Sequence, residues 1–84
     1  MAVKDAVVQR FQQICNQRGI KANELATMSG ITPSTVYSMM ESSRRDLSII
    51  TIKKLCDGLE ITLIEFFDTA EFRALEQEIQ YLYP

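Results

Sequence analysis

The chain has 84 residues, of which 46% are hydrophobic and 24% are charged, a balance typical of one small globular domain and not of a disordered protein. Its apolar runs are short and no signal-peptide stretch opens it, so we expect no membrane span and a cytoplasmic location. Residues 1–56 hold eight Lys and Arg against four Asp and Glu, whereas residues 57–84 hold one against seven. This division favours a basic surface that meets phosphate while the acidic end points away, and ordinary solvated surface charge is the alternative.

The first predicted element is a helix over about residues 3–18. An apolar stripe with helical spacing runs along it, formed by Val7, Phe11, Ile14 and Cys15. Gly19 follows and ends the helix.

The two cysteines, Cys15 and Cys56, each lie on the apolar stripe of a predicted helix, and the chain has no histidine. Two separated thiols leave a structural metal site without enough ligands, and they do not form a disulfide framework. We therefore expect buried free thiols and no metal or other cofactor.

Residues 22–41 predict two short helices joined by a tight turn. Gly30 ends the first helix where the backbone needs a positive φ, Thr32 caps the second, and Pro33 takes its first position. The side chains expected to pack the pair are Leu25, Ala26, Ile31, Val36, Met39 and Met40. The pattern indicates a helix-turn-helix, whose second helix can enter a DNA major groove, and a purely structural hairpin is the alternative.

After a polar loop over residues 42–47, Ser48 is expected to cap a fourth helix. One face of that helix is predicted to be buried, and it consists of Ile49, Ile52, Leu55, Cys56 and Leu59. Gly58 near the end of this helix indicates fraying or close packing.

Thr62 and Glu65 form a capping-box pattern that starts a short helix with Phe66 and Phe67. A last helix, capped by Asp68 or Thr69, is predicted to continue to about residue 82. Its apolar residues recur at three, four and three positions, which indicates a seam for a homodimer or for docking on the first helix: Phe72, Leu75, Ile79 and Leu82.

Three segments, residues 24–37, 49–59 and 61–67, resemble the lambda-repressor-like (Cro-type, XRE) helix-turn-helix family of bacterial and phage regulators. The resemblance covers about residues 4–68. It implies an all-α, five-helix bundle as a DNA-binding domain over residues 1–68, followed by an extra C-terminal helix over residues 69–84 as a possible dimerisation element.

The resemblance also implies the roles of individual residues on double-stranded DNA. The positions that face base edges are Pro33, Ser34, Tyr37 and Ser38, and the helical wheel places residues 34, 37, 38 and 41 opposite the buried face. The positions that touch the phosphate backbone are Thr32, Thr35, Ser43, Arg44 and Arg45. This sequence departs from the family pattern at Lys21, Ala22, Leu47 and Glu41-Ser42, where a carboxylate near phosphate opposes binding.

We therefore predict a sequence-specific transcriptional regulator, acting as a small dimeric repressor on a two-fold operator. The alternative is a protein-interaction module of the same fold, antitoxin-like or a regulator's partner, with weak or no DNA binding. The chain has no histidine, nucleophile elbow or phosphate-cradling glycine loop, so we predict neither enzymatic activity nor a small-molecule substrate.

Overall fold

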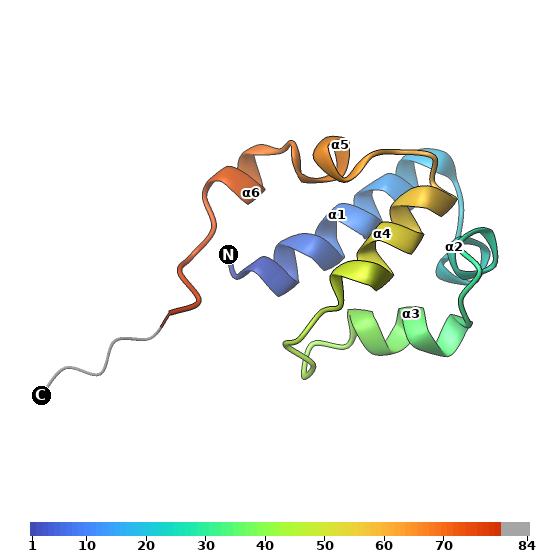
Figure 1. Ribbon diagram of the computed structural model, residues 1–84, viewed down its shortest axis with the longest axis horizontal. Helices are drawn as coiled ribbons and strands as arrows, with labels where there is room; N and C mark the ends of the chain where they lie inside the picture. Colours follow the sequence, from blue (N-terminus) through green and yellow to red (C-terminus); the bar gives the residue numbers. More distant parts are fainter. Residues whose placement is uncertain (80–84) are drawn as a thin grey trace, which may run out of the picture.

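The computed structural model describes residues 1–79, and within them it contains six helices and no strand (Figure 1). The helices are α1 (Val3–Arg18), α2 (Ala22–Met28), α3 (Pro33–Met40), α4 (Ile49–Gly58), α5 (Leu63–Phe67) and α6 (Ala70–Arg73). The predicted all-α fold, with five helices and an additional C-terminal one, is confirmed.

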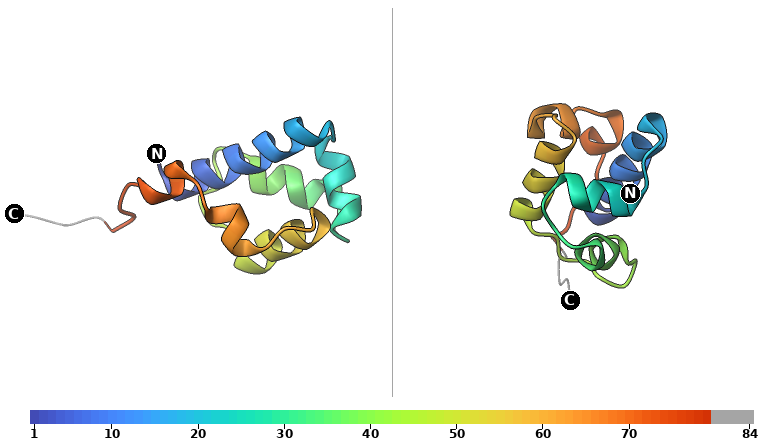
Figure 2. Two further views of the ribbon diagram at one scale, coloured as in Figure 1. Left: turned by 90° about the horizontal axis from the view of Figure 1, so that it is seen from above. Right: turned by 90° about the vertical axis from the view of Figure 1, so that its right-hand side faces the viewer.

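A single core joins the first five helices. It consists of Val7, Phe11, Ile14, Cys15, Leu25, Ala26, Val36, Met39, Ile52, Leu55, Cys56, Leu59 and Phe66. α2 packs against α3 and α4, α5 packs against α4, and α6 packs against α1. Figures 1 and 2 place α3 at one edge of the molecule and α5 and α6 at the opposite edge. The core therefore holds α3 at a free surface.

Local sequence features determine where the helices begin and end. Gly19 and Gly30 adopt φ of 65° and 69°, the left-handed conformation that glycine adopts without strain. The hydroxyls of Thr32, Ser48 and Thr62 each accept a backbone N–H three residues later, so the predicted caps of α3, α4 and α5 are confirmed.

Gly58 marks close packing of α4 on α2. A Cβ added there would collide with the hydroxyl of Ser29 and lie 3.0 Å from the carbonyl carbon of Met28. Of the two alternatives that the sequence left open, close packing is the correct one. Glycine is needed at this position because there is no room for a side chain.

Both cysteines are buried free thiols, as predicted. Burial raises the pKa of Cys15 above its ordinary value and raises the pKa of Cys56 to about 11. Both therefore behave as small apolar side chains of the core. Among residues 1–79, no group of His, Cys, Asp or Glu has a geometry that could hold a metal ion.

The predicted long C-terminal helix is wrong beyond Arg73. Thr69 caps α6 as expected, but the helix has four residues, and residues 74–79 are not helical. Phe72 packs on the aromatic rings of Phe66 and Phe67, with ring centroids 5.7 and 4.8 Å apart. A helix this short depends on such tertiary packing, and it ends where the packing ends.

The predicted apolar seam consequently does not form one helical face in the described chain. Phe72 belongs to the aromatic cluster of its own molecule, Leu75 is half-buried, and the side chain of Ile79 is 67% exposed. Leu82 lies outside the described residues. Of the two alternatives for this segment, its described part docks beside the first helix. α6 packs on α1, and the N–H of Glu76 donates to the carbonyl of Met1 at 3.1 Å.

The predicted burial of Ile49 is also wrong. The sequence pattern predicts it on the buried face of α4, yet 55% of its surface is exposed. It is the first residue of α4, directly after the exposed loop, so the helix end projects beyond its packing partners.

In the described part of the chain, no helix is long and apolar enough to cross a membrane.

Candidate nucleic-acid interface

One face of α3 is open to solvent and carries the residues predicted to read bases. Pro33, Ser34 and Tyr37 are exposed and Ser38 is half-buried, whereas Val36 on the opposite face is completely buried. The structure therefore brings these four residues onto one accessible surface. Their contact with bases remains a prediction.

The hydroxyls at the start of α3 form a cluster. The hydroxyl of Thr32 lies 2.9 Å from that of Thr35 and 3.0 Å from that of Ser34, and it also accepts the backbone N–H of Thr35. The N-terminal end of a helix has free N–H groups and a partial positive charge, both of which suit a phosphate oxygen. This cluster could therefore donate hydrogen bonds to one phosphate group.

Tyr37 is tied to α2 by a contact that the sequence interpretation missed. Its hydroxyl donates to the side-chain oxygen of Asn23 at 2.6 Å. The two residues are 14 positions apart in the sequence, and no local pattern indicates that they meet. The bond leaves the aromatic ring on the open face of α3, where a ring can touch a thymine methyl group.

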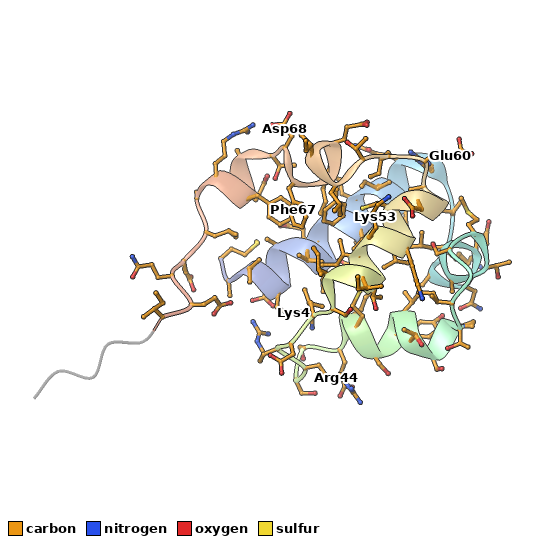
Figure 3. The ribbon with its side chains drawn as sticks, viewed as in Figure 1. Lys4, Arg44, Lys53, Glu60, Phe67 and Asp68 are labelled. Atoms are coloured by element: carbon orange, nitrogen blue, oxygen red, sulfur yellow. The ribbon has the colours of Figure 1, made fainter. Side chains whose placement is uncertain are left out.

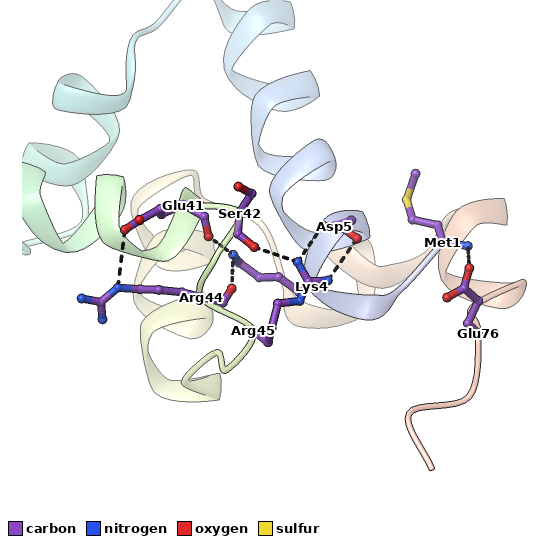
Figure 4. Close-up of polar contacts among 8 residues, drawn as sticks. All are labelled: Met1, Lys4, Asp5, Glu41, Ser42, Arg44, Arg45 and Glu76. Carbon is purple, nitrogen blue, oxygen red and sulfur yellow. Dashed lines mark hydrogen bonds and ion pairs between the residues drawn. The ribbon is translucent and has the colours of Figure 1, made fainter. Parts of the chain in front are cut away.

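Lys4 holds the loop that follows α3. Its side chain is only 1% exposed, and its ammonium donates to the carbonyl oxygens of Glu41 at 2.7 Å and Arg44 at 2.6 Å (Figure 4). The carbonyl of Glu41 belongs to the C-cap of α3, where the negative end of the helix dipole favours a cation, and that of Arg44 lies in the following loop. Lys4 thus fixes the end of α3 against α1.

The sequence interpretation counted Lys4 as surface charge, although its spacing contained a signal. Lys4 precedes Val7 by three positions and Phe11 by seven, so all three lie on the same stripe of α1. A lysine on an apolar stripe needs buried acceptors, and the loop carbonyls supply them.

The loop after α3 brings the other predicted phosphate contacts together, but each is paired with an acidic side chain. Arg45 forms a two-pronged contact with Asp5, at 3.3 and 3.1 Å, and also donates to the carbonyl of Ser42 at 3.0 Å. The guanidinium of Arg45 lowers the pKa of Asp5, and Asp5 raises the pKa of Arg45.

Glu41 is the acidic partner of the other two loop residues, Ser43 and Arg44. Its carboxylate lies 3.8 Å from Nε of Arg44 and accepts a hydrogen bond from the hydroxyl of Ser43 at 2.8 Å. A phosphate that approaches this loop therefore meets cations that already have partners. Binding it requires these contacts to exchange.

Two arginines of α1 also turn toward helix ends. Arg10 donates to the carbonyls of Glu65 and Phe66 at 3.1 and 2.9 Å, and Arg18 donates to the carbonyl of Leu59 at 2.6 Å. With Lys4, three cations of the basic half cap the ends of α5, α4 and α3. The division of charge along the sequence therefore overstates the positive charge available to a ligand.

The two classes of predicted contact meet in one shallow pocket of about 330 Å³ between α3, the loop and α4. Its lining includes Ser34 and Ser38 from the base-facing set, and Thr35 and Arg44 from the phosphate set. Figure 3 shows Arg44 at this edge and the acidic residues Glu60 and Asp68 at the opposite edge. The pocket therefore offers hydroxyl groups and one guanidinium on the α3 side, with the carboxylate residue Asp46 beside them.

Comparison with known proteins agrees with this geometry. The helix-turn-helix family matches residues 11–66, more than half of the chain, and the chain belongs to this family of DNA-binding regulators. The lambda-repressor-like fold class predicted from the sequence is thereby confirmed.

A solved structure titled "Crystal structure of the prophage Lp1 protein 11" is similar to the chain, with a TM-score of 0.78 and 29% sequence identity. The match covers 89% of this chain and 100% of that one. No curated protein matches the chain.

Proposed function

We propose that this protein binds double-stranded DNA as a sequence-specific transcriptional regulator, with α3 in the major groove. The observation that carries the proposal is the open face of α3 within a helix-turn-helix fold, bordered by hydroxyls at one end and a loop with two arginines at the other. The base-reading residues are Pro33, Ser34, Tyr37 and Ser38. The backbone-binding residues are Thr32, Thr35, Ser43, Arg44 and Arg45.

The base-facing residues of α3 give only modest sequence specificity. Serine hydroxyls accept or donate with several bases, and they discriminate less than bidentate arginine or glutamine side chains do. One copy of α3 contacts a few base pairs, so useful specificity requires two copies with their recognition helices roughly 34 Å apart on a two-fold site. The proposed regulator is therefore a homodimer, and it acts as a repressor by occupying a promoter.

The proposed dimer contact lies in the segment after α6. The exposed Ile79 and the half-buried Leu75 supply apolar surface there. Sedimentation should show a dimer, and Leu75→Asp with Ile79→Asp should give a folded monomer with weaker operator binding. A variant that stays dimeric would place the interface elsewhere, and circular dichroism checks that it is folded.

A protein-interaction module is the second candidate. Two observations favour it: the loop arginines already have acidic partners, and large apolar side chains are exposed on α4 and α5, among them Ile50 and Ile64. Such a module would bind its partner through apolar surface and would show little affinity for DNA.

Salt dependence separates the two functions. Binding to a random DNA duplex is measured at several salt concentrations, because phosphate contacts weaken linearly with log salt, by a slope of about 0.9 per contact. Arg44→Ala with Arg45→Ala should flatten the slope by about one unit per lost contact, while Arg73→Ala on α6 is the control at the far edge. Absence of salt-dependent binding would exclude the DNA function and leave the interaction module.

A further inference from the structure

We propose that Asp5, which lies outside the helix-turn-helix, competes with DNA phosphate for Arg45 and thereby limits the affinity of this protein for DNA. The inference rests on the proposed function. Asp5 lies in the first turn of α1, 40 positions before Arg45, and both side chains are about half exposed. Figure 4 shows the two residues meeting beside Lys4.

The geometry of the Asp5–Arg45 contact makes Asp5 and a phosphate group compete for the same edge of the guanidinium. Both carboxylate oxygens accept hydrogen bonds from the two terminal nitrogens of the guanidinium, at 3.3 and 3.1 Å. A phosphate group binds arginine in the same two-pronged way and through the same edge. Arg45 can therefore bind a phosphate bidentately through this edge only after Asp5 has left it.

The exchange is feasible because the pair is exposed. Ion pairs in contact with water contribute little to stability, so little is lost when Asp5 gives way. Once Asp5 has lost Arg45 as its partner, however, its negative charge remains close to the DNA phosphates and repels them. Asp5 thus opposes binding twice, first by occupying Arg45 and then by its own charge.

The loop does not need Asp5 to keep its shape. Lys4 holds the carbonyls of Glu41 and Arg44 independently of any arginine side chain, and Arg45 keeps its bond to the carbonyl of Ser42. Removing the Asp5 carboxylate should therefore free the guanidinium without releasing the loop. This separates a competitor from a residue that merely positions the loop.

The test is Asp5→Asn, measured on a random DNA duplex over a range of salt concentrations. We expect binding about two- to fivefold tighter at low salt, from the energy range of exposed ion pairs, and a salt slope steeper by up to about 0.9. Asp68→Asn is the matched control, because it removes the same charge and breaks an ion pair with Arg73 at the opposite edge. The control should leave affinity and slope almost unchanged.

A double-mutant cycle assigns the effect to Arg45. In the background of Arg45→Ala, Asp5→Asn should lose most of its gain, because no guanidinium remains to be freed. A gain that persists fully in this background, a gain no larger than that of Asp68→Asn, or weaker binding by Asp5→Asn would each overturn the inference.

Two controls keep the result interpretable. Circular dichroism verifies that each variant is folded, and Asp5→Ser replaces Asp5→Asn if the latter is not. If the wild-type chain shows no salt-dependent binding, the proposed DNA function fails. If the wild type binds but the cycle shows no coupling, the function stands and the competition by Asp5 is wrong.

Discussion

Replacement of Lys4 by methionine tests whether α1 holds the end of the recognition helix. Methionine keeps most of the apolar stem of the side chain but lacks the ammonium, which donates to two carbonyl oxygens. The carbonyl of Glu41 keeps a second donor, the N–H of Arg44 at 3.1 Å, whereas that of Arg44 can turn to water in the exposed loop. The substitution therefore removes two charge-assisted hydrogen bonds from a buried group.

Two opposing contributions determine how much Lys4→Met changes the free energy of unfolding. A hydrogen bond to a charged group contributes about 1.5–3 kcal/mol, and the substitution removes two of them. The ammonium no longer has to be desolvated, which offsets part of that loss. We expect Lys4→Met to lower the free energy of unfolding by about 2 kcal/mol, equivalent to roughly 8–16 °C in Tm for a domain of this size.

Urea denaturation followed by circular dichroism measures the effect, with Lys54→Met as the control. Lys54 is exposed on α4, and its substitution should change stability by less than about 0.5 kcal/mol. A Lys4→Met variant as stable as this control, or more stable than the wild type, would refute the idea that the buried ammonium anchors the loop. Its DNA binding should also weaken, because the loop would lose its fixed position.

Three further predictions concern packing, ionisation and the α2–α3 contact. Gly58→Ala should destabilise the protein by about 1–2 kcal/mol despite the better helix propensity of alanine, and Ser29→Ala should restore part of this loss in urea denaturation by removing the hydroxyl that the new Cβ meets. Because the pKa of Cys56 is about 11 in the folded protein and lower when unfolded, this thiol loses its proton first in the unfolded chain. Its contribution to stability should therefore fall by about 2 kcal/mol as the pH rises from 9 to 11. A variant with Cys56→Ala should lose this contribution and keep only the slope from Cys15, whose pKa is also raised. Tyr37→Phe removes the hydrogen bond to Asn23 and should lower the free energy of unfolding by about 1 kcal/mol, measured by thermal unfolding. The salt slope of DNA binding should not change, and a changed slope would mean that the hydroxyl binds phosphate.

The sequence by itself determined the order and most of the boundaries of the helices. Gly19 and Gly30 end helices, and Thr32 and Thr62 begin them, through backbone conformations and bonds that span only a few residues. Such interactions are local, so they can be read from neighbouring positions. The apolar spacing around Phe11 also predicted which helix faces form the core.

The tertiary structure decided which of these elements carry functional contacts. Asp5 and Arg45 meet across 40 positions, and Lys4 binds carbonyls that are 37 and 40 positions away. The last helix ends at Arg73 because aromatic packing, rather than the heptad-like pattern, determines how far it extends. These outcomes depend on which surfaces come together, and a periodic pattern describes only the surface of one element. The fold therefore determines how much positive charge is left without a protein partner. Three cations of α1 bind helix ends, and the loop arginines pair with acidic side chains.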